Sequence, residues 1–138
     1  MRLAESNRPK YVDRTVDFAN LLASISVGLD QAEQFSKAEI LLRECLQIRS
    51  SELSDHWSTS NAKSLLGVAL SKQGKVVEAE PLLIEGYQEL KSQGSKDPAC
   101  PKQRVTDALT RLIAHFSRTD QAEHLSRWNQ ELTSLSTQ

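Results

Sequence analysis

One five-residue motif occurs twice in the sequence, and its two copies lie 41 residues apart. The copies are Ala-Glu-Ile-Leu-Leu at 38–42 and Ala-Glu-Pro-Leu-Leu at 79–83. The similarity continues past the motif, because Glu44-Cys45 follows the first copy and Glu85-Gly86 follows the second at the same distance. A repeat period of about 20–50 residues is typical of a stack of similar units. Such stacks provide binding surfaces, so we expect a binding protein rather than an enzyme.

The composition restricts the class of protein further. The chain has 138 residues, which fits one domain. Its formal net charge of −1 argues against general attraction to nucleic acid or to an anionic membrane. The two cysteines have no metal-ligand spacing, and free thiols indicate a reducing compartment, so we expect a cytoplasmic protein. The first nine residues resemble no signal peptide, and the longest apolar stretch, 21–29, is too short to span a bilayer.

Apolar residues recur at helical spacing along almost the whole chain, and no segment shows the alternation typical of a strand. We therefore predict an all-α protein with six helices, at about 11–30, 35–53, 59–73, 76–92, 101–117 and 121–135. Ser58 or Thr59 suits the start of the third helix, and Gly74 suits its end. Pro101 suits the first position of the fifth helix, and the preceding residues 94–101 should form a loop.

The third and fourth predicted helices place small residues where two helices of a hairpin would approach closely. Gly67 lies on the first of them and Ala79 on the second, and Ser26 and Ala38 take the corresponding positions one repeat earlier. The pattern resembles the tetratricopeptide (TPR) repeat, and the residues that carry it are Leu66, Gly67, Leu70, Gly74, Ala79 and Leu83. The resemblance implies a right-handed superhelical stack of antiparallel hairpins, at about 11–53, 58–93 and 101–136.

The third repeat can be aligned with the others in two ways. Matching Ala122-Glu123 to the earlier Ala-Glu pairs gives a spacing of 43 residues. Matching the turns instead puts Leu125 opposite Ala79, at a spacing of 46 residues. We prefer the second alignment, because it also places Phe116 opposite Leu70. A leucine in place of the small residue predicts looser packing of the last hairpin, or a terminal cap.

The period exceeds the 34 residues usual for TPRs and resembles the longer, kinesin light chain-type repeat. More specifically, segments 38–49, 56–57, 61–67 and 79–87 resemble the C-terminal TPR region of large bacterial serine/threonine protein kinases. This resemblance covers about residues 10–130 and implies a scaffolding or regulatory module, either the tail of such a kinase or a free-standing relative. It implies no kinase activity here, because the chain lacks a Gly-rich loop, a catalytic Asp motif and Asp-Phe-Gly.

The same resemblance organises the chain into two parts. Residues 11–136 should form a single TPR-like domain, and residues 1–10 a disordered or extended segment. We expect no catalytic residue, no cofactor and no metal site.

In TPR proteins the first helix of each hairpin lines a concave groove, so the resemblance identifies groove candidates by position. Asn20 and Asn61 take equivalent positions, and an asparagine amide offers a donor and an acceptor to the backbone of an extended peptide. The simpler interpretation is that these asparagines are solvated. The groove lacks the set of Lys and Arg needed for the known C-terminal carboxylate clamp. The candidates are Asn20, Ala23, Val27, Asn61, Ser64, Val68, Asp107, Thr110, Arg111 and Ala114.

A basic stripe is the second candidate surface. Arg104, Arg111 and Arg118 are spaced by seven residues, so they should lie along one side of the fifth helix, near the edge of the groove. Such a stripe could receive an acidic peptide or a phosphate group, although a solvated face explains it more simply. We expect no nucleic acid, because no aromatic residues alternate with these arginines.

Other reactive side chains have structural interpretations. The histidines form no metal-binding pattern, and we expect all three, His56, His115 and His124, at the surface or at helix ends. Cys45 takes a small position of the core, which predicts a buried and inert thiol. Trp128 should pack in the core, unless it marks a docking surface. No Ser-His-Asp set can be argued from the sequence.

Three hypotheses about function follow. The first is a non-catalytic protein-interaction module whose partner is a protein or peptide that the sequence does not name. The second is a structural spacer or self-association unit of a longer array, which would form a homo-oligomer through the exposed faces of its terminal hairpins. The third is an enzyme, which no group of residues supports.

Overall fold

Six α-helices joined by short connections make up the chain. The computed structural model describes the backbone of residues 2–137 and the side chains of residues 15–137. The helices are α1 Arg2–Gln31, α2 Phe35–Glu52, α3 Trp57–Lys72, α4 Val76–Lys96, α5 Lys102–Arg118 and α6 Ala122–Ser136. The prediction of an all-α protein is therefore confirmed for residues 2–137, which contain no strand. None of these helices combines the length and the apolar character needed to cross a membrane.

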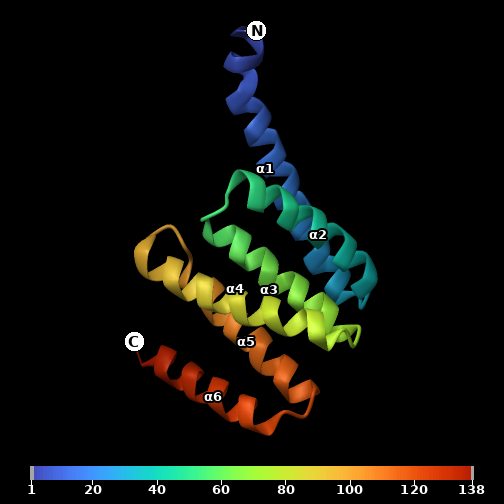
Figure 1. Cartoon of the computed structure of the whole chain (residues 1–138), viewed down its shortest axis with the longest axis vertical. Coiled ribbons are helices and arrows are strands. Elements are labelled where there is room, and N and C mark those ends of the chain that lie inside the picture. The colour runs from blue at the N-terminus through green and yellow to red at the C-terminus, as the bar shows by residue number, and fades with distance from the viewer. Residues whose placement is uncertain (1, 138) are drawn as a thin grey trace.

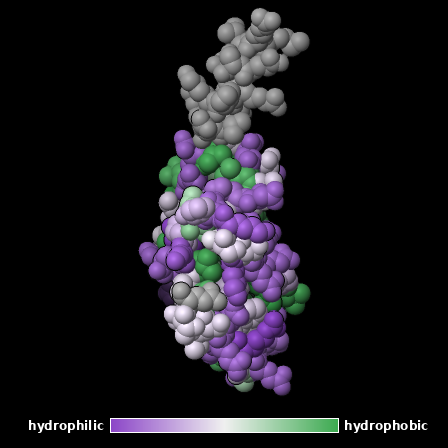
Figure 2. All heavy atoms as spheres, turned by 90° about the vertical axis from the view of Figure 1, so that its left-hand side faces the viewer, coloured by the Kyte–Doolittle hydropathy of each residue, from purple (hydrophilic) through white to green (hydrophobic). Residues whose placement is uncertain are grey.

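Each helix packs against the next one along the chain (Figure 1). The backbone of α3 also approaches those of α1 and α5. The backbones of α2 and α4 do not approach each other, and these helices meet through the ion pair of Arg43 and Glu78, at 2.9 Å. Helices α1, α3 and α5 thus form a continuous row. The N-terminal half of α1 projects beyond the other helices (Figure 1). On the face shown in Figure 2, hydrophilic residues predominate and hydrophobic ones form small separate patches.

The turns that end α1, α3 and α5 share one geometry. Each contains a residue with a positive φ angle, and these residues are Glu33 at 59°, Gly74 at 81° and Asp120 at 57°. The next residue donates a backbone hydrogen bond to the carbonyl five positions earlier, a bond that closes many helix ends. The three bonds are Gln34 to Leu29 at 2.7 Å, Lys75 to Leu70 at 3.0 Å and Gln121 to Phe116 at 3.1 Å. The turns therefore follow the preferred alignment of the third repeat, with Phe116 opposite Leu70.

The repeated Ala-Glu motif connects the first hairpin to the second. Ala38 is fully buried, and the adjacent Glu39 carboxylate accepts hydrogen bonds from Gln73, at the end of α3, and from Lys75, in the next turn. Both distances are 2.9 Å. Burial raises the pKa of Glu39, but the hydrogen bonds from Lys75, Arg43 and Gln73 outweigh it and lower the pKa to about 2. The motif is thus a cross-link between hairpins as well as a packing element.

The second copy of the motif forms the equivalent connection to the third hairpin. Ala79 is fully buried, and the Glu80 carboxylate accepts a hydrogen bond at 2.7 Å from Gln121, which occupies the turn position that Lys75 has in the previous repeat. Burial raises the pKa of Glu80, whereas hydrogen bonds from Gln121 and His115 lower it, and the net shift is downward.

Two segments differ from the predicted helix boundaries. Helix α1 begins at Arg2, so residues 2–10, which we expected to be disordered or extended, lie inside it; residue 1 lies outside the described part. Leu3, Ala4 and Glu5 are good helix formers, which favours this continuation. Helix α4 continues to Lys96, through part of the predicted loop. A Cβ atom at Gly94 would lie only 3.2 Å from Val105, so the glycine lets the start of α5 pack against the end of α4.

The helix caps also differ. Helix α3 begins at Trp57, and His56 rather than Ser58 or Thr59 caps it, because the His56 Nδ1 atom accepts a hydrogen bond from the Ser58 backbone at 3.1 Å. Ser58 and Thr59 lie inside the first turn and are buried. Pro101 precedes the first residue of α5 instead of occupying that position.

Candidate functional site

A hollow of about 290 Å³ lies on the row formed by α1, α3 and α5. We call it the groove. It includes five of the groove residues that were predicted from the sequence: Val27, Val68, Thr110, Arg111 and Ala114. Charged groups from all three helices also line it: Asp30, Lys72, Arg111 and Arg118.

The charges of the groove are unbalanced. Lys72 donates to Asp30 at 3.1 Å, so this cation is paired. The other carboxylate oxygen of Asp30 is buried and has no hydrogen-bond partner among the described residues. Arg111 and Arg118 add two further cations, so the lining carries three positive charges and one negative charge. An anionic group is the ligand that this arrangement favours.

Arg111 is held in place from α3. Its Nη1 atom donates to the Asn61 side-chain oxygen at 3.3 Å and to the Ser64 hydroxyl at 3.1 Å. Burial lowers the pKa of Arg111, and the nearby Asp107 opposes this effect. A guanidinium fixed by two acceptors on the neighbouring helix presents its remaining donors in a defined direction.

The other predicted residues lie outside the groove or behind it. The Asn20 side-chain oxygen accepts a hydrogen bond from Arg49 at 3.0 Å, as the Asn61 oxygen does from Arg111. Both predicted amides therefore use their acceptor to hold an arginine of the chain itself. Asp107 accepts a hydrogen bond from Gln103 at 2.9 Å.

The predicted basic stripe divides into separate parts. Arg104 lies 3.6 Å from Asp107 on its own helix and does not line the groove. Arg111 and Arg118 do line it, and Arg118 donates to the Ser71 hydroxyl at 2.8 Å. Two arginines of the stripe, Arg111 and Arg118, therefore line the groove, and the third, Arg104, forms an ion pair outside it.

The sequence did not predict a buried chain of hydrogen bonds behind Arg118, which joins Ser71, His115 and Glu80. We call it the relay. His115 is fully buried, so it does not lie at the surface; it lies in the last turn of α5, the other position that the sequence predicted for it. Its Nδ1 atom lies 2.6 Å from the Ser71 hydroxyl, and its Nε2 atom lies 3.0 Å from a Glu80 carboxylate oxygen. A neutral imidazole satisfies both neighbours by accepting from Ser71 and donating to Glu80. The relay thus joins α3, α4 and α5.

This Ser-His-Glu arrangement resembles a catalytic triad in its order but not in its surroundings. The Ser71 oxygen already accepts a hydrogen bond from Arg118, and only 7% of the residue is exposed. Ser71 lies at the carboxyl end of α3, where the helix dipole is negative and would oppose a developing oxyanion. The geometry suits a structural cross-link.

The Cys45 thiol and groups of possible metal ligands are the remaining candidates for chemistry. Cys45 is fully buried, as expected, and its Sγ atom donates to the Ala19 carbonyl at 3.3 Å. Burial raises the pKa of Cys45, which keeps the thiol protonated at neutral pH. In the part of the chain that the structure describes, no three His, Cys, Asp or Glu side chains gather as metal ligands would.

Comparisons with known proteins add no family. No protein-family model matches the chain, and no curated protein matches it either. The TPR resemblance therefore stays a prediction, and the groove geometry is the starting point for function.

Proposed function

We propose that the chain is a TPR-like, right-handed superhelical stack of three antiparallel hairpins and that it binds a protein partner without catalysing a reaction. The identical turns after α1, α3 and α5 support a repeated unit. So do the equivalent cross-links of Glu39 and Glu80 to the following turn. Backbone contacts run mainly between neighbouring helices, as they do in stacked repeats.

The observation that carries the proposal is the groove. Its lining has three cations and one carboxylate, a net charge of +2, whereas the whole chain has −1. Its volume of about 290 Å³ accommodates one or two side chains of a bound segment. An acidic, extended segment of a partner protein is the ligand with complementary charge. The resemblance to kinase C-terminal regions extends the proposal to a partner in cytoplasmic signalling.

The first prediction concerns this groove. The double variant Lys72→Glu/Arg118→Glu should weaken binding of a fluorescein-labelled, glutamate-rich peptide at least tenfold, or about 1.4 kcal/mol. Both changes replace attraction by repulsion at the lining. Fluorescence anisotropy measures the affinity, and added salt should weaken the wild-type complex.

A matched control separates the groove from net charge. Lys37→Glu/Lys96→Glu makes the same charge change at two exposed positions outside the groove. This control should bind the peptide within about twofold of the wild type, because distant exposed charges are screened. Equal losses in both double variants would contradict a binding role for the groove.

Self-association is the second candidate function, and the exposed face of α1 favours it. Phe18, Leu21 and Ile25 are 45%, 56% and 45% exposed, and their spacing places them along one face of the helix. A two-fold dimer brings the same patch of each subunit together, which suits an apolar stripe.

The corresponding prediction is a dimer that Leu21→Glu dissociates. Size-exclusion chromatography with light scattering should give twice the chain mass at high concentration for the wild type and the single mass for the variant. Val77→Glu changes an 89% exposed residue on α4 and should leave the dimer intact. A wild type that stays monomeric at every concentration rules out this function.

A further inference from the structure

A larger hollow of about 740 Å³ lies between α4, α5 and α6 and shares no lining residue with the groove. We call it the α4–α6 hollow. Its lining includes four residues that are each less than a tenth exposed, namely Tyr87, Cys100, Val105 and Trp128. Hollows of about 300–1,000 Å³ with a partly apolar lining are typical of small-ligand sites.

Two aromatic rings form a fixed wall of this hollow. The rings of Tyr87 and Trp128 meet edge to face, with their centroids 5.8 Å apart and an interplanar angle of 85°. The Tyr87 hydroxyl donates to Glu131 at 2.7 Å, which orients the phenol. Such a wall contacts a flat, apolar body over a defined area.

Trp128 also carries an unused donor. Its indole Nε1 atom is buried and has no hydrogen-bond partner among the described residues. Most buried N–H groups in proteins are paired, and an unpaired one costs free energy. An acceptor supplied from outside the chain would remove this cost.

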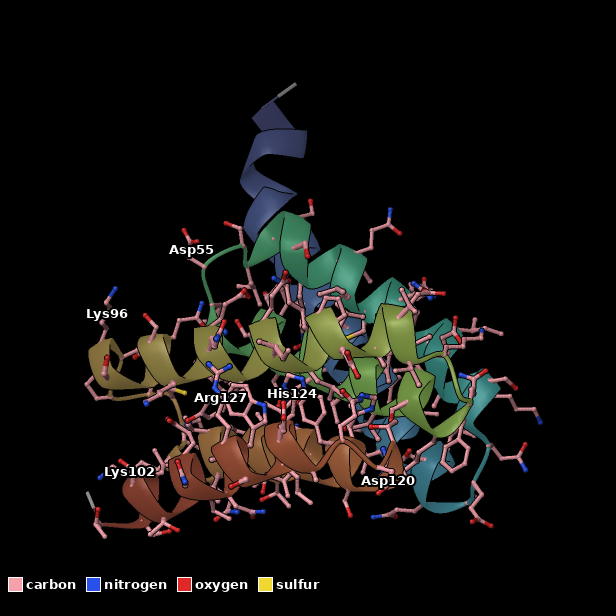
Figure 3. All side chains as sticks on the ribbon, turned by 60° about the horizontal axis from the view of Figure 1, so that its bottom comes forward. Asp55, Lys96, Lys102, Asp120, His124 and Arg127 are labelled. Carbon is pink, nitrogen blue, oxygen red and sulfur yellow. The ribbon has the colours of Figure 1, made fainter. Side chains whose placement is uncertain are left out.

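The rim of the hollow is positively charged. Lys91 pairs with Glu131, which is the one carboxylate among the lining residues. The Arg127 guanidinium lies 4.8 Å from the centre of the Trp128 ring, and Figure 3 shows this side chain between α6 and α4. Lys102, at the first position of α5, adds a third cation. The lining therefore carries three positive charges and one negative charge, which attract an anion.

We propose that the α4–α6 hollow binds a small organic anion with an apolar, aromatic body. The body packs against Tyr87 and Trp128, and the acidic group lies at the rim near Arg127 and Lys102. A polar atom of the ligand accepts the hydrogen bond that the Trp128 indole offers. This site is independent of the groove, so the failure of one proposal leaves the other standing.

The experiment uses 8-anilino-1-naphthalenesulfonate, an aromatic anion, and N-phenyl-1-naphthylamine, which lacks the sulfonate. The chain has two tryptophans, so Trp57→Phe leaves Trp128 as the sole indole. We expect saturable binding of the sulfonate at one site, with quenching of Trp128 emission. The indole signal of Trp128 in a ¹H–¹⁵N spectrum should shift as its N–H gains an acceptor.

Charge variants test the rim. Lys102→Glu/Arg127→Glu should weaken sulfonate binding at least tenfold and binding of the neutral probe less than threefold. Lys102→Glu alone, which leaves the Arg127–Trp128 contact in place, should show the same preference to a smaller degree. The groove variant Lys72→Glu/Arg118→Glu should leave both affinities within about twofold, since these residues do not line the hollow.

Three results would overturn the proposal. They are sulfonate binding that does not saturate, an unmoved Trp128 indole signal at saturation, and an equal loss of sulfonate affinity in the rim and groove variants.

Discussion

Gly86→Ala is expected to destabilise the protein by about 2–3 kcal/mol, although it adds a single methyl group. Gly86 lies on α4 where that helix meets α3. A Cβ atom there would lie 2.9 Å from the Ser64 backbone nitrogen and 3.0 Å from the Ser60 carbonyl oxygen. Backbone atoms cannot rotate away as a side chain can, so the two helices would have to separate. This cost exceeds the gain of about 0.5–1 kcal/mol that alanine otherwise brings to a helix interior.

Urea denaturation of Gly86→Ala and Gly28→Ala measures the effect against its control. A Cβ atom at Gly28 would meet nothing within 4 Å, so this variant keeps only the helix-propensity gain. We expect its free energy of unfolding to rise by about 0.5–1 kcal/mol. Equal behaviour of the two variants would mean that α3 and α4 do not approach closely at Gly86.

Much of the fold could be predicted, because close helix contacts and helix ends leave local signals in the sequence. Small residues, apolar spacing and turn residues are local signals, and the repeat shows them twice. The sequence pattern places Gly67 at a helix–helix contact, and a Cβ atom at this position would indeed lie only 2.6 Å from the Leu83 side chain. The pattern also places Gly74 at a helix end, and this residue has the positive φ angle that favours glycine there.

The candidate site was predictable only in part, because its key contacts join residues far apart in the chain. Arg111 and Asn61 are both predicted peptide contacts, yet they bond to each other across 50 positions. In the sequence His115 is a basic residue in the last turn of α5, and only the packing of α3 and α4 around it makes it a buried bridge. No periodicity indicates such pairs. The one available signal was the second Ala-Glu motif, since its glutamate, Glu80, bonds to His115.

His115→Ala is the second large effect that we expect, with a loss of about 3–5 kcal/mol in the free energy of unfolding. The substitution removes a fully buried ring and leaves a cavity between α3, α4 and α5. It also leaves the Ser71 hydroxyl and the Glu80 carboxylate each without one of their hydrogen-bond partners. His124→Ala is the control, because that histidine is exposed and its ring stacks on Phe116 at the surface, at 5.0 Å between centroids. It should cost about 0.5 kcal/mol or less.

His115→Phe separates the two parts of this loss. Phenylalanine fills most of the space but offers no hydrogen bond, so the variant should lose about 1–3 kcal/mol, because Ser71 and Glu80 each lose one hydrogen-bond partner and keep another. If His115→Phe is as stable as the wild type while His115→Ala is not, the ring acts only by filling space, and the relay adds nothing to stability. If His115→Ala loses more stability than His115→Phe, and both lose some, then the hydrogen bonds of His115 and the space that its ring fills both stabilise the contact between the second and third hairpins. Arg118 would then line the groove from a position that the relay helps to fix, since it bonds to the same Ser71 oxygen.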